Sequence, residues 1–449
     1  MGHLTENQLA SVRMLIQAAP DSAVRDLETT LSSGSERHET MRLIHNMVMA
    51  EAADRRGRNA VFRPVVPLCH PLRRDFLGLT FPPAALAKLW RGLKTEARVE
   101  VAAALAVAND LGSEGPPNPA YDALCLRAAA GLRERSNDGY AGAAAALDQA
   151  RPDGSDLFAA YLDLVPVSRA ALDRMSEWLG RLSDDRIAAA RVAFRDAVAV
   201  AEDAGPRLLE VLYAHLEEPW AVLRLVSAVM HRPSDKYVAG SELAVFGERL
   251  LDDIDARLKL VSAFAADNGR QAGLQAGDAV RVAALQIQEF DESMDLSPEG
   301  PWGSRLTRQK RALGQAVEGR LKAAEAEVAA ALPLQSSGFK KGARGHPRLT
   351  ADPDPRQVNR ARAFLVLLHE VRGSADRLGF GSLWGKVEDS IEARLDTYIE
   401  DLLEKLRGGE EGQNPDRVKL YLDIAAEFLG LASGDKAAQI VRRRVAAAA

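Results

Sequence analysis

One histidine in this chain stands among residues that could support chemistry on an anionic group. His369 offers an imidazole, and an unprotonated imidazole has a ring nitrogen that can act as a nucleophile or exchange a proton. Arg372 follows three residues later, so on a helix its guanidinium lies on the same face and can stabilise negative charge. Gly373 comes next, and glycine inside a helix costs about 1 kcal/mol relative to alanine. A glycine at such a place usually serves packing or function.

The residues around His369 follow a longer pattern, H-x-V-R-G-S-A-x-x-L-G-F over 369–380. This pattern resembles the phosphorylation motif of histidine phosphotransfer domains, with Arg372 in place of the family's usual lysine. The resemblance covers about 355–432. It implies a helical bundle in which His369 accepts a phosphoryl group from the aspartate of a response-regulator receiver domain. Arg372 would stabilise the transferred charge, and Gly373 would let the receiver approach closely.

The residues before the histidine leave a second interpretation open. Leu365 and Val366 lie four and three positions before His369, within an apolar run that is typical of a largely buried helix. If their face is packed, His369 is a hydrogen-bonded histidine between helices. We expect the motif helix to span 356–378 and to end at Gly379, because glycine commonly ends helices.

The composition predicts the fold class. The chain has 449 residues, of which 47% are hydrophobic but only 5% aromatic, and alanine and leucine dominate the apolar share. Both are strong helix formers, and apolar residues recur at helical spacing along the chain. We therefore expect an all-α protein, an irregular array of helical hairpins followed by a C-terminal helical bundle.

Charge and cysteine content limit the partners and the compartment. The net charge of −5 argues against nucleic-acid binding, which favours strongly basic domains. Two cysteines, Cys69 and Cys125, make neither a disulfide framework nor a metal site and fit a reducing compartment. The chain opens without signal-peptide features, and no apolar run reaches the roughly 18 residues of a membrane span. We expect a cytoplasmic protein without membrane insertion, metal or cofactor.

Breaks in the helical pattern divide the sequence into four regions. These are an N-terminal helical region at 1–115 with a Pro-rich irregular segment at 57–83, a helical array at 116–332, a basic flexible linker at 333–355, and C-terminal helices with the motif at 356–449. Prolines in the irregular segment forbid a regular helix, while arginines alternate with apolar residues there. That segment either packs against the body of the protein or forms a basic docking surface.

The linker carries the second candidate site. Its basic residues are Lys340, Lys341, Arg344 and Arg348, accompanied by glycine and proline but by no periodic pattern. The simplest interpretation is a flexible tether, and we expect 338–348 to be mobile. The alternative is a contact with an anionic partner, either an acidic protein or a nucleic acid.

A phosphotransfer bundle would need four helices, for which the sequence offers 304–332, 356–378, 382–407 and 415–431. The chain has no kinase ATP-binding motif and no receiver motif, so phosphate would have to arrive from another protein. The sequence therefore predicts a signalling adaptor that is at most a phosphotransfer intermediate. The alternative is a non-catalytic helical scaffold that binds protein partners without phosphotransfer. Either function is compatible with a homodimer.

Overall fold

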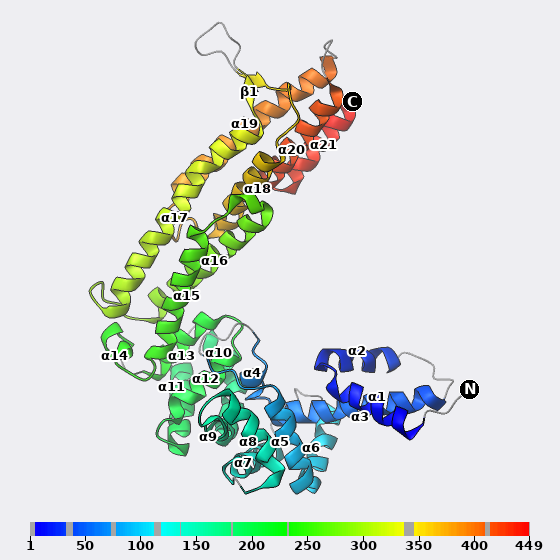
Figure 1. Ribbon diagram of the computed structural model, residues 1–449. Helices are drawn as coiled ribbons and strands as arrows, with labels where there is room; N and C mark the ends of the chain where they lie inside the picture. Colours follow the sequence, from blue (N-terminus) through cyan, green and yellow to red (C-terminus); the bar gives the residue numbers. More distant parts are fainter. Residues whose placement is uncertain are drawn as a thin grey trace. The chain divides into compact units, whose positions relative to one another are not determined.

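The computed structural model describes residues 5–32, 39–72, 78–111, 118–134, 136–180, 183–230, 233–335, 345–408 and 414–448. The chain folds into two compact units, Met1–His231 and Arg232–Ala449. The described residues are almost entirely helical, which confirms the all-α class (Figure 1). The division into units falls inside the region predicted as one helical array, and the predicted linker lies within the second unit.

The first unit consists of many short helices. They are α1 (Glu6–Ala18), α2 (Asp21–Ser32), α3 (Glu39–Val61), α4 (Val66–Cys69), α5 (Ala84–Glu96), α6 (Arg98–Leu111), α7 (Pro119–Arg133), α8 (Asp138–Ala150), α9 (Gly154–Asp163), α10 (Val165–Leu179), α11 (Asp184–Val200), α12 (Ala204–Ala214) and α13 (Val222–Val229), with a 3-10 turn η1 at Pro219–Ala221. Consecutive helices contact one another, as α7 does with α8 and α11 with α12. Contacts of α5 with α8, of α7 with α9 and of α3 with α6 join these pairs into an array.

The predicted irregular segment at 57–83 differs in part from the expectation. Helix α3 continues to Val61, so the prolines interrupt the helix only after that residue. Phe62 and Val65 are fully buried in the main core of the unit, and Phe81 is nearly so. These apolar residues support packing against the body of the protein. Residues 73–77, with part of the arginine-rich sequence, lie outside the described residues.

The second unit consists of fewer and longer helices. Its elements are α14 (Asp235–Ala239), α15 (Ala244–Ser262), η2 (Ala266–Asn268), α16 (Arg270–Ser293), α17 (Pro301–Ala331), β1 (Leu334–Gln335), β2 (His346–Pro347), α18 (Pro355–Val371), η3 (Arg372–Ser374), α19 (Gly381–Gly408), α20 (Pro415–Ser433) and α21 (Asp435–Ala448). Helix α17 packs against α18 and α19, and α20 packs against the same two helices. Each of the four helices that the sequence assigned to a bundle therefore contacts two others of the four. Helix α16, which is not one of the four, packs against α18.

The ends of the predicted linker are ordered against this bundle. Strands β1 and β2 pair antiparallel, with Leu334 opposite Pro347. Arg417 of α20 donates to the Leu349 carbonyl at 3.0 Å, and the Tyr421 hydroxyl donates to the Ala351 carbonyl at 3.2 Å. The chain around 345–352 thus contacts α20 through hydrogen bonds from side chains to backbone carbonyls. Residues 336–344, which include 338–344 of the segment predicted to be mobile, lie outside the described residues.

Candidate functional site

His369 lies in the last turn of α18, close to the end of that helix. The helix begins with Asp354, whose side chain accepts a hydrogen bond from the Arg356 backbone N–H. It ends at Val371, seven residues earlier than the sequence predicted. The backbone then tightens into the 3-10 turn η3 and reaches Gly379, whose φ of 80° suits glycine, before α19 begins. Gly373 therefore lies in this turn and not inside an α-helix.

Burial along α18 changes within one turn of the histidine. Leu365 is fully buried and Val366 is 4% exposed, whereas the side chain of His369 is exposed. Arg372 and Gly373 are exposed as well. A Cβ atom placed on Gly373 would meet no described atom within 4 Å. His369 is therefore outside the packed interface that buries Leu365 and Val366.

A tryptophan that the sequence analysis did not single out organises the end of α18. Trp384, in the first turn of α19, donates its indole N–H to the Leu368 carbonyl at 2.8 Å. That carbonyl is one of the last four of the helix, which lack partners within the helix. The guanidinium carbon of Arg372 lies 5.1 Å from the centre of the Trp384 ring, a cation–π arrangement. Trp384 thus joins α18 to α19, and its ring packs against the guanidinium of Arg372.

An acidic residue completes the surroundings of His369. Partial burial raises the pKa of Glu388 on α19, although the nearby positive charge of Arg372 and an interaction with His369 act in the opposite direction. The site therefore combines an exposed imidazole, a guanidinium supported by an aromatic ring, and a carboxyl group that ionises less readily than usual. This arrangement can present a nucleophilic nitrogen next to a cation on an open surface.

Only one residue of the second predicted site, Arg348, is described, and it lies apart from His369. Lys340, Lys341 and Arg344 lie outside the described residues. Arg348 is exposed just after β2, and its backbone N–H donates to the Pro333 carbonyl at 2.9 Å. Arg348 thus lies on the chain that leads into the start of α18, while His369 lies near the end of this 17-residue helix. A helix of that length spans about 25 Å, so the two places are separate.

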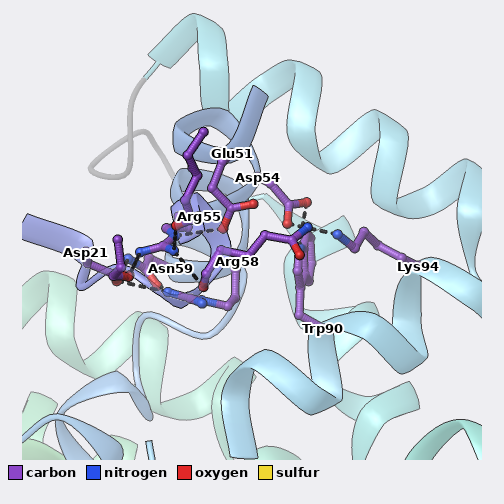
Figure 2. A network of polar contacts seen from close by, with 11 residues as sticks. Asp21, Glu51, Asp54, Arg55, Arg58, Asn59, Trp90 and Lys94 are labelled. Atoms are coloured by element: carbon purple, nitrogen blue, oxygen red, sulfur yellow. Dashed lines mark hydrogen bonds and ion pairs between the residues drawn. The ribbon is translucent and has the colours of Figure 1, made fainter. Parts of the chain in front are cut away.

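Figure 2 shows a polar network in the first unit that the sequence analysis also missed. At its centre Arg55, 7% exposed, donates to Glu51 and Asp21 at 2.8 Å each. Arg55 also donates to the carbonyls of Ile16, Gln17 and Ala19, which end α1. The only sequence signal was an arginine-rich stretch at the end of a predicted helix.

The same network continues from α3 to α5. Asp54 accepts hydrogen bonds from the indole N–H of Trp90 at 2.9 Å and from Lys94 at 2.8 Å. Both oxygens of this carboxylate are therefore occupied by protein donors. The network neutralises its own charges and connects helices, which makes it a structural feature and not a catalytic one. In the described parts of the chain, no group of three or more His, Cys, Asp or Glu side chains is placed to hold a metal ion.

Two broader findings complete the description. Within the described residues, no helix is both long enough and apolar enough to cross a lipid bilayer. Comparison of the chain with protein-family models, with curated proteins and with solved structures gave no significant match.

Proposed function

We propose that this protein is a cytoplasmic helical signalling adaptor whose second unit accepts a phosphoryl group on His369. The observation that supports the proposal is the exposed imidazole of His369, with exposed Arg372 three residues later and an uncovered Gly373 beside it. These three residues are thus accessible together, as a phosphoryl donor would require. The surrounding helices α17 to α20 form a firm support for the site.

The proposed reaction is a transfer from an aspartyl phosphate of a receiver domain. An imidazole nitrogen of His369 attacks the phosphorus, and the N–P bond forms while the P–O bond to the aspartate breaks. The aspartate carboxylate leaves with the electron pair. Arg372 stabilises the charge on the phosphoryl oxygens, and its position over Trp384 limits the conformations it must lose on binding them. Gly373 allows the receiver surface to approach without a side chain in between.

The test is incubation of the full chain with phosphorylated receiver domains, followed by measurement of acid-labile phosphate. We expect the wild type to gain phosphate and His369→Gln to gain none. His346→Gln is the matched control, because His346 is another partly exposed histidine of the same unit, and this variant should behave as the wild type. Arg372→Ala should slow the transfer about tenfold to a hundredfold. Acid-labile phosphate that persists in His369→Gln would exclude this residue.

A non-catalytic scaffold that binds protein partners is the second candidate. The observation that favours it is the early end of α18, which places Arg372 and Gly373 in a 3-10 turn close to the acidic Glu388. In that case the exposed end of α18 is a protein-binding surface. Failure to accept phosphate from every receiver tested, with receiver binding retained in His369→Gln, would support this second function.

A further inference from the structure

Helices α1 and α2 are held to the rest of the first unit by little apolar contact. Among the described residues, the core that they share with α3 has only four buried side chains, with five partly buried ones packed against them: Ile16, Val24, Val48 and Ala52, then Val12, Ala19, Leu31, Ile44 and Met47. Large apolar side chains on the same three helices remain exposed instead: Met14, Leu15, Leu27, Met41 and Leu43. Because hydrophobic stabilisation grows with the apolar area removed from water, this small core contributes little to docking.

Two surface hollows flank the contact with α3. One of about 560 Å³ lies between α1, α3 and α5 and is lined in part by Ile16, Met47 and Lys94. The other, of about 360 Å³, lies between α2 and α3 beside Val24 and Ala52. The two helices thus leave parts of the α3 surface on either side of the contact uncovered.

Charged groups provide most of the specific contacts instead. The buried Arg55 of α3 donates hydrogen bonds to carbonyls at the end of α1 and to one oxygen of Asp21 at the start of α2. Arg58 donates to the other oxygen of Asp21 at 2.9 Å. Further along α2, Glu28 accepts from Arg56 with both carboxylate oxygens, at 2.6 and 2.7 Å. Each of these contacts joins α1 or α2 to α3.

Helix α3 has separate anchors to the remainder of the unit. Asp54 is bound by Trp90 and Lys94 of α5. At the end of α3, Arg169 of α10 donates to the carbonyls of Ala60 and Val61. None of these contacts involves α1 or α2, so α3 keeps them if the two preceding helices leave.

We infer that α1 and α2 form a charge-latched arm, which can leave α3 while the rest of the first unit stays folded. The latch is the set of contacts from Arg55, Arg56 and Arg58 to the arm. Departure of the arm exposes the apolar face of α3 around Val48 and Ala52. It also exposes the guanidinium of Arg55 to water. The inference is independent of His369 and of phosphoryl transfer.

Hydrogen–deuterium exchange of the full chain tests the arm directly. We expect the amides of α1 and α2 to exchange about tenfold or more faster than those of α7 to α9, the helices of the main core of the same unit. Exchange in α1 and α2 as slow as in α7 to α9 would overturn the inference, because the unit would then open only as a whole.

Asp21→Asn tests whether charge forms the latch. Loss of the carboxylate shared by Arg55 and Arg58 should speed exchange in α1 and α2 by about a further tenfold, with α7 to α9 unchanged. The matched control is Asp203→Asn, which removes an exposed ion pair with Arg207 in the same unit and should change neither region. Equal acceleration of α7 to α9 in Asp21→Asn would show that Asp21 supports one cooperative unit. If that variant does not fold, Glu28→Gln tests the same latch through Arg56.

Discussion

The two units solve the same problem, the packing of helices, in different ways. The first uses many short helices, such as α9, α12 and α13 with 10, 11 and 8 residues. The second uses long ones, such as α16, α17 and α19 with 24, 31 and 28 residues. Every helix end leaves as many as four backbone groups without partners inside the helix. The first unit therefore has many more such groups to satisfy per residue.

Arginines satisfy many of the helix ends in the first unit. Arg55 donates to the carbonyl end of α1 and Arg169 to that of α3. Arg191 does the same for α13, and Arg224 for α10. A guanidinium suits this task because it offers five donors in a planar fork and is attracted to the negative end of the helix dipole. Stability in this unit thus depends on charged groups that are taken out of water.

In the second unit, close approach of helix backbones joins two of the long helices. Gly273 and Gly277 of α16 lie against α18, where a Cβ atom would come within 2.5 Å of the Ala363 carbonyl oxygen or 2.2 Å of the Glu370 Cβ. We therefore expect the arginine-bound helix ends of the first unit to be sensitive to loss of a charge, and the contact of α16 with α18 in the second unit to be sensitive to added volume. Four variants can break or sharpen this contrast.

Arg169→Ala should have the largest effect. Arg169 is 3% exposed and donates to Asp122 at 2.8 Å as well as to the carbonyls of Ala60 and Val61. Its loss leaves these acceptors without their partner, so we expect the free energy of unfolding to fall by about 3–5 kcal/mol. Urea denaturation measures the change. The exposed pair of Arg207 is the control, and Arg207→Ala should cost less than about 1 kcal/mol. Equal losses in both variants would contradict the role of buried arginine.

Gly273→Leu should be nearly as damaging in the second unit. The new side chain would meet the Ala363 carbonyl and Val366 and push α16 away from α18, at a cost of about 3 kcal/mol. Thermal unfolding of the variant measures this loss. Gly319→Ala on α17 is the matched control, since no described atom lies within 4 Å of its added Cβ. This control should stabilise the helix by about 0.5–1 kcal/mol. Tolerance of leucine at Gly273 would refute close packing as the basis of the second unit.

Acid should weaken the first unit through His215. Burial lowers the pKa of His215 to about 4, and its Nε2 lies 3.0 Å from the Pro64 carbonyl oxygen. Above about pH 6.5 the imidazole is neutral in both the folded and the unfolded chain. Between pH 6.5 and 4 only the unfolded chain takes up the proton, so the free energy of unfolding should fall by about 2–3 kcal/mol as pH decreases. Urea unfolding at several pH values measures it. His215→Gln should show a shallower decline; an unchanged slope would exclude His215 as the cause.

Asp235→Ala should have the smallest effect of the four. The buried carboxylate of Asp235 accepts the backbone N–H groups of Trp302 at 3.0 Å and Gly303 at 3.1 Å, at the start of α17. It thus caps a helix from a distant part of the chain. Removal should cost about 1–2 kcal/mol in chemical denaturation, as for other N-cap residues. Asp235→Asn keeps an acceptor oxygen and should lose less. An equal loss in the asparagine variant would show that the charge, and not an acceptor oxygen, is what matters.

Much of the fold could be predicted because helix formation depends largely on residues that are near one another in the sequence. Alanine, leucine and their periodic spacing predicted the helical class and the four helices α17 to α20. Even there the end of the motif helix was placed seven residues too late, since Gly379 was taken as the stop. The indole of Trp384 binds the Leu368 carbonyl near the end of this helix. No local rule identifies a partner 16 residues away.

The candidate site divides in the same way. From the sequence alone came the residue types of His369, Arg372 and Gly373 and the apolar run before them, all of which are local properties. Only the tertiary structure decided that His369 is exposed while Leu368 before it and Val371 after it are buried, because exposure depends on which other helices cover a face. The same holds for Arg55, whose partners at the end of α1 lie 36 to 39 residues away in the chain. Long-range contacts of this kind are set by how helices pack, and helix propensity carries no information about them.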